Sequence, residues 1–324
     1  MIMSVDLKIG VYFSANDVVY DWAVAFLNSF RNFNPDLRLI LIPFNDNCQR
    51  LFQLKEKYNF ELYVDDCFDR LEAIGRTFEL GHTPTGPYWF RRYAAFWGVL
   101  DRFLYLDVRQ LVLGDLTPLI TALDRYNFDL LYYDCAIDQV YEPGEFRQEL
   151  LRQGKGRGFN SGRWAARKGL FSIDEFEELA TAALKIRSQL NPRNPDQAFI
   201  NYCCDLKPIR CGHFAEVIGG LCQNAWARQP GKIYRSDADY RLWDYGGLDH
   251  KKQVILLHWA GSKLSATMPH RNLFDRYFLQ ERSIWQRSIV QLGNWLKYLA
   301  EVCINLPRRN RILNNFYHQL KYKV

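Results

Sequence analysis

A carboxylate and a guanidinium stand two residues apart at the end of one apolar stretch. Residues 102–116 read RFLYLDVRQLVLGDL, so an apolar run delivers Asp107 to a strand end and Arg109 follows. Two carboxylates at this spacing, joined by an imidazole, would form a hard, oxygen-rich site suited to Mn²⁺ or Mg²⁺. Arginine donates hydrogen bonds but cannot ligate a cation. The stretch therefore offers part of a metal site with a fixed positive charge beside it.

Apolar runs of strand length must position these side chains. Six such runs occupy residues 7–14, 37–44, 60–65, 102–107, 129–135 and 253–259. Helical patterns separate most of them, such as residues 20–33 and 172–190, and Ser172 with Glu175 makes a capping box for the second pattern. Near-continuous apolar strands that alternate with helices predict an α/β fold, with a mostly parallel central sheet and helices on both faces.

In such a sheet, ligands bind beyond the carboxyl ends of the strands. We therefore expect four parts of the chain to meet at one edge: residues 14–17, residues 107–109, Asp134 and residues 258–263. No GxGxxG follows the first strand and no GxxxxGK[ST] occurs, which disfavours a dinucleotide site and a P-loop.

Composition bounds the class of protein. The 324 residues are 48% apolar and 24% charged, which indicates a globular chain with one large core or two ordinary ones. No run reaches the roughly 18 apolar residues of a spanning helix, and the first residues lack a secretory signal pattern, so we expect a cytoplasmic protein. The eight cysteines include no CxxC pair, which favours reduced thiols over a zinc site or a disulfide framework.

The last part of the chain differs in character, and we expect a main domain over residues 1–280 and a basic, amphipathic helical segment over residues 281–324. One helical stripe contains Trp285, Ile289, Leu292, Leu296, Leu299 and Cys303. Pro307 should end that helix, and the tail after it combines basic and aromatic residues. Such a segment could lie on the anionic inner face of a membrane, or pack on its own domain or on a second subunit in a homo-oligomer. The net charge of +6 is modest and no nucleic-acid motif is present, so we expect no nucleic-acid partner.

Four motifs, in order along the chain, carry a resemblance to a known family. They are LYLDVRQLVLGDL (104–116), FNSG (159–162), PDQAFIN (195–201) and HWAGSK (258–263). Together they resemble the GT-A nucleotide-sugar glycosyltransferases, particularly glycosyltransferase family 8, which includes glycogenin and bacterial lipopolysaccharide galactosyl- and glucosyltransferases. The resemblance covers about residues 5–275. The chain departs from the family pattern twice, with Arg109 in place of the second carboxylate of the D-x-D motif and Ala198 in place of a later carboxylate.

The resemblance implies a GT-A fold and the transfer of a hexose from a nucleotide diphosphate sugar, with UDP-glucose or UDP-galactose as the usual donor. The acceptor would be a glycan or a lipid-linked sugar, and the anomeric configuration would be retained. Mn²⁺ or Mg²⁺ would serve as cofactor, a point that Arg109 puts in question. For this transfer, a metal or fixed cations must absorb the charge that develops on the departing diphosphate.

The same resemblance implies roles for particular residues. Asp107 and His258 would hold the metal. Gln197 and Asp196 would act in catalysis, with Gln197 stabilising an oxocarbenium-like transition state and Asp196 binding sugar hydroxyls. Arg109 joins the catalytic candidates on the chemistry of its guanidinium, which can pair with a diphosphate in place of a metal, and not on the resemblance. Residues implied in donor binding are Asn16, Asp17, Arg91, Arg92, Asp107, Asn160, Gly261 and Lys263, of which Lys263 stands one position earlier than the family's lysine.

Structural explanations compete with these roles. Arg109 could pair with the diphosphate in place of a metal, could mark a site that has lost its donor, or could point away into an ordinary ion pair. Asp196 could simply cap a helix, Asn160 could belong to a turn, and His258 could be a core histidine. The chain is thus predicted to be a glycosyltransferase, with a non-catalytic binding or scaffolding protein of the same fold as the alternative. The missing carboxylates favour the alternative. The enzyme is favoured because a dead site has no need of polar residues in one cleft, and the chain has five of them together: Asn160, Asp196, Gln197, His258 and Lys263.

Overall fold

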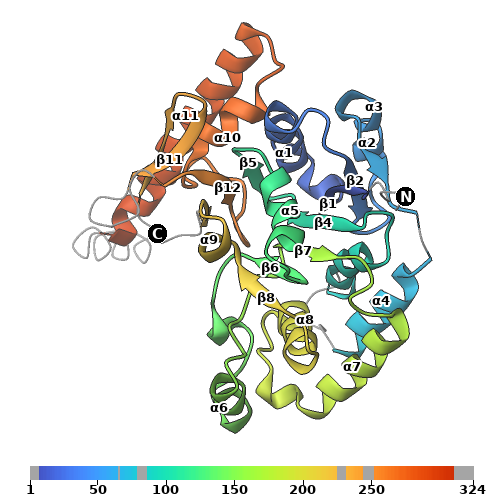
Figure 1. Cartoon of the computed structure of the whole chain (residues 1–324). Helices are drawn as coiled ribbons and strands as arrows, with labels where there is room; N and C mark the ends of the chain where they lie inside the picture. Colours follow the sequence, from blue (N-terminus) through green and yellow to red (C-terminus); the bar gives the residue numbers. More distant parts are fainter. Residues whose placement is uncertain (1–6, 65, 79–85, 225–230, 244–251, 310–324) are drawn as a thin grey trace, which may run out of the picture.

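A seven-stranded sheet runs through the middle of the molecule (Figure 1). The structure is a computed structural model that describes residues 7–64, 66–78, 86–224, 231–243 and 252–309. The strands, in spatial order, are β3 (Glu61–Leu62), β2 (Leu39–Pro43), β1 (Ile9–Ala15), β4 (Arg102–Asp107), β7 (Arg163–Arg167), β6 (Leu130–Tyr132) and β8 (Cys211–His213). Among these described strands, β7 alone runs antiparallel to its neighbours, so the sheet is mostly parallel, as predicted.

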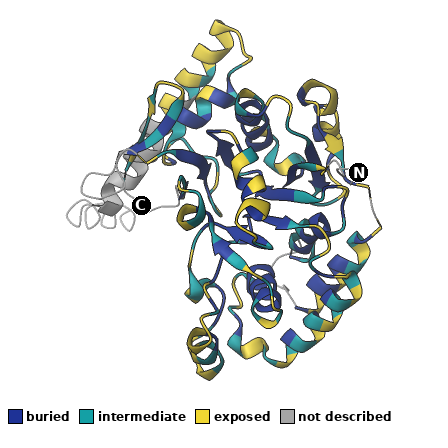
Figure 2. Cartoon of the chain, in the orientation of Figure 1, coloured by how far each residue is buried: buried dark blue, intermediate teal, exposed yellow. Residues whose placement is uncertain are grey.

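Helices cover both faces of this sheet, and the alternation of side chains along β1 shows how. Val11 and Phe13 point into one apolar cluster, and Tyr12 points into the cluster on the opposite face. The first cluster includes side chains of α1 (Tyr20–Phe33), α5 (Thr117–Arg125) and α10 (Arg271–Phe278); the second includes side chains of α4 (Phe68–Thr77), the 3₁₀-helix η2 (Pro87–Phe96), α7 (Ile173–Lys185) and α8 (Pro195–Leu206). Burial on both faces explains why the strands read as near-continuous apolar runs (Figure 2).

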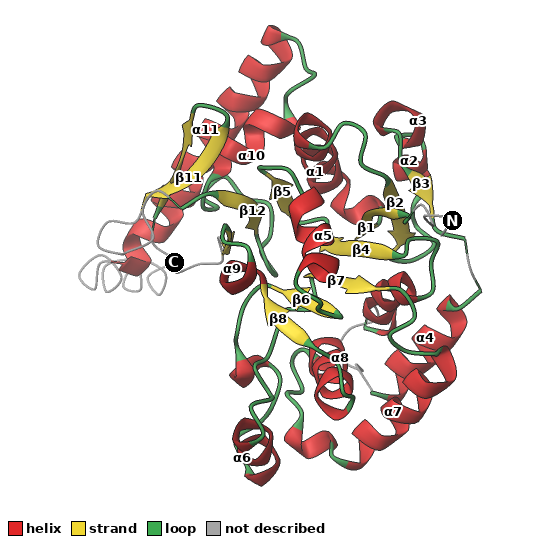
Figure 3. Ribbon diagram, in the orientation of Figure 1, coloured by secondary structure: helices red, strands yellow, loops and turns green. Residues whose placement is uncertain are grey.

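A smaller sheet continues from the main one. Its strands are β5 (Gln110–Val112), β12 (Val254–His258) and β9 (Leu221–Asn224), in the order β5-β12-β9. The chain passes from β4 to β5 through Val108 and Arg109, and His258 pairs with Gln110 across the β5–β12 ladder. The ends of β4 and β12 are therefore held together at the junction of the two sheets. A hairpin of β10 (Lys232–Ser236) and β11 (Asp239–Trp243) forms a separate two-stranded sheet (Figure 3), and it packs next to the start of β12, where Arg241 makes an antiparallel bridge with Gln253.

The remaining helices are short connections, except the last one. They are η1 (Asp17–Val19), α2 (Gln49–Phe52), α3 (Lys55–Tyr58), η3 (Ile137–Gln139), α6 (Glu145–Arg152), η4 (Arg187–Gln189), α9 (Phe214–Val217) and α11 (Ile284–Arg309). No helix in the described part of the chain combines the length and the apolar character that crossing a bilayer requires.

Two local predictions can be compared directly with the structure. The predicted cap of α7 is confirmed, since the Ser172 hydroxyl accepts a hydrogen bond from the backbone N–H of Glu175 at 3.1 Å. The prediction that Pro307 ends the last helix is wrong, because α11 continues to Arg309. Proline removes one backbone hydrogen bond, and a long helix with many others can continue past it. The boundary between residues 280 and 281 stays a prediction.

Candidate functional site

Asp107 lies at the carboxyl end of β4, beside the end of β1, where Ser14 is its partner in register. The Tyr105 hydroxyl donates to Asp107 Oδ1 at 2.8 Å, and the Asp107 backbone N–H donates to the Gly162 carbonyl at 2.8 Å. A Cβ on residue 162 would come within 2.6 Å of Asp107 Oδ2, so any larger residue here would force the carboxylate to move. The last residue of the FNSG motif thus makes room for the carboxylate.

Arg92 connects this carboxylate to the start of α8. Its Nη1 donates to the Ser161 hydroxyl at 2.8 Å, and lies 3.4 Å from Asp196 Oδ2 and 3.6 Å from Asp107 Oδ2. Burial disfavours the charge of Arg92, but the two carboxylates outweigh this effect and raise its pKa. A charged guanidinium is therefore held between carboxylates that come from two different elements.

Asp196 and Gln197 are buried at the first turn of α8. The Ser161 hydroxyl donates to Asp196 Oδ2 at 3.0 Å, and the Ser161 backbone N–H donates to Gln197 Oε1 at 3.2 Å. The N-cap of α8 is Asn194, so helix capping does not explain Asp196. Burial raises the pKa of Asp196, against the effect of the Arg92 charge. The PDQAFIN and FNSG motifs, far apart in the sequence, meet through one serine.

The two arginines of η2 have different surroundings. Arg91 is buried, donates to Glu72 at 2.6 Å and to Asp46 at 3.0 Å, and lies over the rings of Phe68 and Tyr88. Its charge is therefore balanced by its own neighbours. Of the two predicted candidates, Arg92 is the one that contacts Asp107 and Asp196.

The residues that follow β1 are also engaged within the chain. Asn16 is buried and donates from Nδ2 to Asn45 Oδ1 at 3.2 Å. The carboxylate of Asp17 accepts hydrogen bonds from the backbone N–H groups of Arg50 and Leu51, each at 3.0 Å. Asp17 thus supports the first turn of α2, whereas the Asn16 amide lies at the sheet edge near Ser14.

Asn160, Gly261 and Lys263 lie in loops at the same edge. The Asn160 side chain accepts a hydrogen bond from the Gly162 backbone N–H at 2.9 Å, which fixes the turn before β7. Gly261 has a φ of +64°, in the region that favours glycine, and Lys263 is exposed. Lys263 follows β12 by five positions, so its place is set by the loop rather than by the sheet.

Arg109 lies between β4 and β5 and is partly buried. Its backbone carbonyl accepts a hydrogen bond from the Trp259 N–H at 2.9 Å, which ties it to the end of β12. Within the described part of the chain, no ion pair of its guanidinium is observed. Its charge is felt at His258, whose pKa is held well below the usual range by burial and by the charges of Arg163, Arg109 and Arg92.

Arg163 is a site residue that the sequence analysis missed. It is completely buried, and its guanidinium contacts Nδ1 of His258 and Oδ2 of Asp134. Asp134 follows β6 with a φ of +73°, a backbone conformation that an aspartate tolerates. A charged residue directly after FNSG, at the start of the apolar strand RWAAR, was the feature that could have revealed it. Ser161 was missed in the same way, because serine is common in turns.

The donor set for a divalent metal can be tested on these contacts. Mn²⁺ and Mg²⁺ need several unpaired oxygens or an unprotonated imidazole nitrogen. Asp107 is engaged with Tyr105 and Arg92, while His258 faces Arg163. Over the described residues, no group of three or more His, Cys, Asp or Glu side chains is arranged to hold a metal ion. The residues present therefore do not fit the metal that the resemblance implies.

Solved structures share this arrangement of elements. The galactosyltransferase LgtC, in complex with donor and acceptor sugar analogues, matches 85% of this chain and 97% of its own with a TM-score of 0.55 and 16% identity. The chain has the GT-A glycosyltransferase fold. The bifunctional glycosyltransferase WbbM matches 88% of this chain and 52% of its own at a TM-score of 0.51 and 14% identity. The glycosyltransferase GlyE of Streptococcus pneumoniae matches 90% of this chain and 63% of its own, with a TM-score of 0.50 and 17% identity. Neither a protein-family model nor a curated protein sequence matches the chain.

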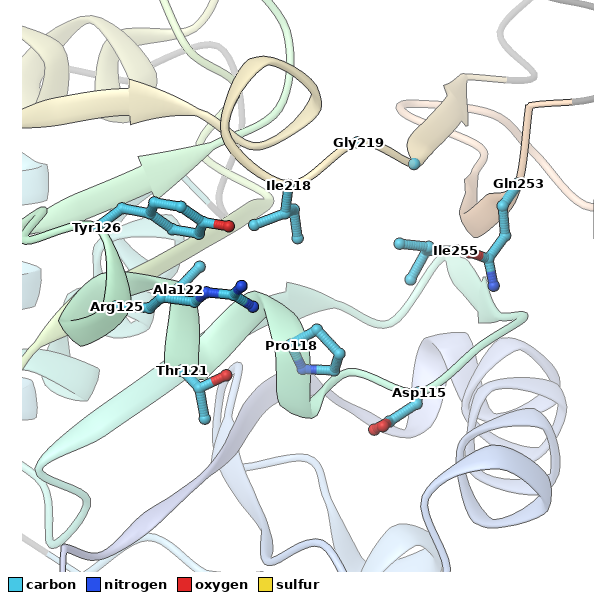
Figure 4. Close-up of a pocket in the computed structure, with 11 residues that line it drawn as sticks. Asp115, Pro118, Thr121, Ala122, Arg125, Tyr126, Ile218, Gly219, Gln253 and Ile255 are labelled. Atoms are coloured by element: carbon cyan, nitrogen blue, oxygen red, sulfur yellow. The ribbon is translucent and has the colours of Figure 1, made fainter.

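Several cavities lie outside this cluster. One, of about 270 Å³, is lined by Asp115, Arg125 and Gln253 among others and is shown in Figure 4. Gln253 precedes β12 and His258 ends it, so this cavity lies at the opposite end of the strand from the GT-A candidate site. A second, of about 530 Å³, is lined by Arg271, Arg276 and Trp295 among others. A third, of about 640 Å³, is bounded by Phe78, Glu142 and Pro195 among others, and Pro195 directly precedes Asp196 in the sequence.

Proposed function

We propose that the protein is a glycosyltransferase that moves a hexose from a nucleotide diphosphate sugar to a glycan or lipid-linked acceptor. UDP-glucose and UDP-galactose are the donors to test first, because the motifs resemble those of a family that uses them. The transfer of a sugar in general is supported by the fold, which this chain shares with glycosyltransferases. The base, the sugar, the acceptor and retention of configuration are part of the proposal.

One observation carries the proposal. Arg92, Ser161, Asp196 and Gln197 form a single hydrogen-bonded group beside Asp107, at the carboxyl edge of the sheet. In α/β sheets this edge is where ligands bind. The group has no role in pairing the strands, and it places a buried carboxylate and a buried amide where a sugar could be held. A scaffolding protein would gain nothing from a buried charged cluster, which costs desolvation energy.

The chemistry assigned to the side chains follows from their types. Asp196 can accept hydrogen bonds from sugar hydroxyls, and the Gln197 carbonyl oxygen can face positive charge that develops at the anomeric carbon. The Gln197 amide is a weak nucleophile, so we assign it electrostatic stabilisation and no covalent intermediate. Arg92 orients Asp196 and supplies positive charge near the leaving diphosphate. Asn16, Asn160, Gly261, Lys263 and Arg109 complete the proposed donor site.

The cavity at Pro195 and the last helix suggest where an acceptor could approach. The cavity lined by Phe78, Glu142 and Pro195 is large enough for a sugar unit, and Pro195 directly precedes Asp196 in the sequence. Along α11, Ile284, Trp285, Ile289, Leu292, Trp295 and Leu296 are exposed, and Arg287 and Lys297 are exposed on the same helix. We propose that this face rests on an anionic lipid surface, where a lipid-linked acceptor would be found. The basic tail after Arg309 lies outside the described residues.

Calorimetric titration tests the donor site directly. The purified protein is titrated with UDP, GDP, ADP and CDP, and the titration is repeated with the Arg92→Ala variant and with Arg125→Ala as an exposed, remote control. We expect UDP to bind the wild-type protein and the control equally, and Arg92→Ala to lose at least about tenfold in affinity. Absence of binding by every nucleotide would overturn the enzyme and favour the scaffolding alternative.

A further inference from the structure

Arg163, Asp134 and His258 form a buried group that decides what His258 can bind. Arg163 begins β7, and none of its side chain is exposed. One terminal nitrogen contacts Nδ1 of His258, and the other contacts Oδ2 of Asp134. The guanidinium thus links the loop after β6 to the end of β12, directly behind the candidate donor site.

The contact with Arg163 fixes the proton of His258. A guanidinium has only donors, so Nδ1 of the imidazole must be the acceptor. A neutral imidazole carries one proton, which then lies on Nε2. The buried ring stays neutral, because burial and three nearby arginine charges oppose a second proton. His258 therefore presents an N–H donor from Nε2.

This arrangement is incompatible with metal ligation by either ring nitrogen. Nδ1 is covered by Arg163. If Nε2 held a metal, the ring proton would move to Nδ1 and would face a group that cannot accept it. Histidines that bind metals usually donate the second ring N–H to a carboxylate or a carbonyl, and here a guanidinium occupies that place.

The guanidinium charges around Asp107 also oppose the binding of a divalent cation. Arg92 lies 3.6 Å from Asp107 and shares its charge with Asp196, and Arg109 stands where a second carboxylate would be needed. A divalent cation would meet the charges of Arg92 and Arg109 beside Asp107, whose two carboxylate oxygens already contact Tyr105 and Arg92. A diphosphate, in contrast, is an anion that guanidinium and N–H donors bind well.

We infer that this edge binds the diphosphate of the donor through fixed donors, namely Arg109, Lys263 and the Nε2–H of His258, without a divalent metal ion. Arg163 is the positioning residue that holds His258 in the donating tautomer. The inference rests on the proposed function, and it goes beyond it by naming the device that replaces the metal.

Metal binding can be measured without any nucleotide. The metal-stripped protein is titrated with Mn²⁺, and free Mn²⁺ is followed by electron paramagnetic resonance. We expect no binding to the wild-type protein or to Arg109→Asp. The double variant Arg109→Asp with Arg163→Val should gain a Mn²⁺ site, because it supplies the second carboxylate and frees His258. A site-bound Mn²⁺ in the wild-type protein that disappears in His258→Gln would overturn the inference.

Two further measurements keep the inference testable if the double variant does not fold. Long-range ¹H–¹⁵N spectra of the wild-type imidazoles, assigned with His258→Gln, should show the Nε2–H tautomer for His258; the Nδ1–H tautomer would contradict it. UDP titrations in EDTA and in Mn²⁺ should give the same affinity. Binding that requires Mn²⁺ would overturn this inference and leave the glycosyltransferase intact. Failure of every nucleoside diphosphate to bind in both conditions would overturn the proposed function, and this inference with it.

Discussion

The guanidinium of Arg92 lies 3.4 Å from the carboxylate of Asp196, and the two side chains are 12% and 6% exposed. The pair joins η2, which precedes β4, to α8, more than a hundred residues later in the chain. Ser161 completes the contact by accepting from Arg92 and donating to Asp196. One buried charge pair thus holds together three of the segments that the proposed reaction needs.

Loss of Arg92 should destabilise the fold as well as the site. In Arg92→Ala, two carboxylates would lose their shared cation, and breaking a buried pair costs about 3–5 kcal/mol. Arg102→Ala serves as a control, because its pair with Asp124 is far more exposed and should contribute less than about 1 kcal/mol. Urea unfolding of both variants measures the difference. An equal loss of unfolding free energy in the two variants would show that the Arg92 ion pair stabilises the fold no more than an exposed pair does.

Substitution of the buried acidic and amide groups should separate turnover from binding. Asp196→Asn and Gln197→Ala should lower kcat by about 10²-fold, as expected when a preorganised group facing developing charge is removed. UDP affinity should change little, because neither side chain is assigned to the diphosphate. Asp138→Asn, an exposed carboxylate paired with Arg147, is the matched control and should behave as wild type. A fall in UDP affinity with unchanged kcat would contradict these roles.

The neutral state of His258 predicts a pH dependence of stability. Burial and the nearby arginines lower its pKa in the folded protein, whereas the unfolded chain titrates near about 6.5. The neutral His258 therefore stabilises the folded protein fully above about pH 6.5. This stabilisation declines as the pH falls, since the unfolded state gains the proton first.

The unfolding free energy of the wild type should accordingly fall faster between pH 6 and 5 than that of His258→Gln, by up to about 1.4 kcal/mol per pH unit. His213 and His270 also have lowered pKa values, but they are present in both proteins and cancel in the comparison. Denaturant titrations at several pH values provide the measurement. Parallel pH profiles would mean that His258 takes up its proton over the same pH range in the folded protein as in the unfolded chain, which would contradict a lowered pKa.

The exposed face of α11 should bind anionic membranes. Trp285 and Leu292 are 82% and 59% exposed, so glutamate at both positions should weaken binding without unfolding the domain. Co-sedimentation with vesicles that contain phosphatidylglycerol should retain the wild type, and the double variant should stay in the supernatant. Val64→Glu, at an apolar residue 89% exposed elsewhere on the surface, is the control. Equal sedimentation of all three proteins would exclude a role for this face.

Much of the architecture follows from patterns that lie close together in the sequence. The run RFLYLD becomes β4 with the predicted bounds, and residues 20–33 form α1 as predicted, because burial on one or two faces leaves a periodic trace. The strand RWAAR was not predicted, since it begins and ends with arginine, and Arg163 is compensated by distant residues, through the charge of Asp134 and the contact with Nδ1 of His258. Tertiary contacts that compensate a buried charge leave no local pattern.

In the candidate site, too, some residues could be predicted from the sequence and others depend on tertiary contacts. The order of the motifs predicts one site for Asp107, Asp196 and Gln197. In the structure these residues lie close together, linked through Arg92 and Ser161. The choice between Arg91 and Arg92 depended on Glu72 and Asp46, which pair with Arg91 from other segments. Asp17 matches a donor-binding position of the family that the chain resembles, but its carboxylate accepts hydrogen bonds from two backbone N–H groups of α2. Spacing alone does not distinguish a side chain that faces a ligand from one already occupied by its neighbours.

Sugar transfer at the Arg92–Asp196 edge can be observed by following UDP-glucose and UDP-galactose by ¹H NMR in the presence of the protein. The account predicts slow release of UDP from one of these donors in the absence of an acceptor, with the free sugar first appearing in the same anomeric configuration as in the donor. Asp196→Asn and Gln197→Ala should suppress the release, and Asp138→Asn should not. A donor that binds and stays intact, or a release that is equal in all four proteins, would contradict the account.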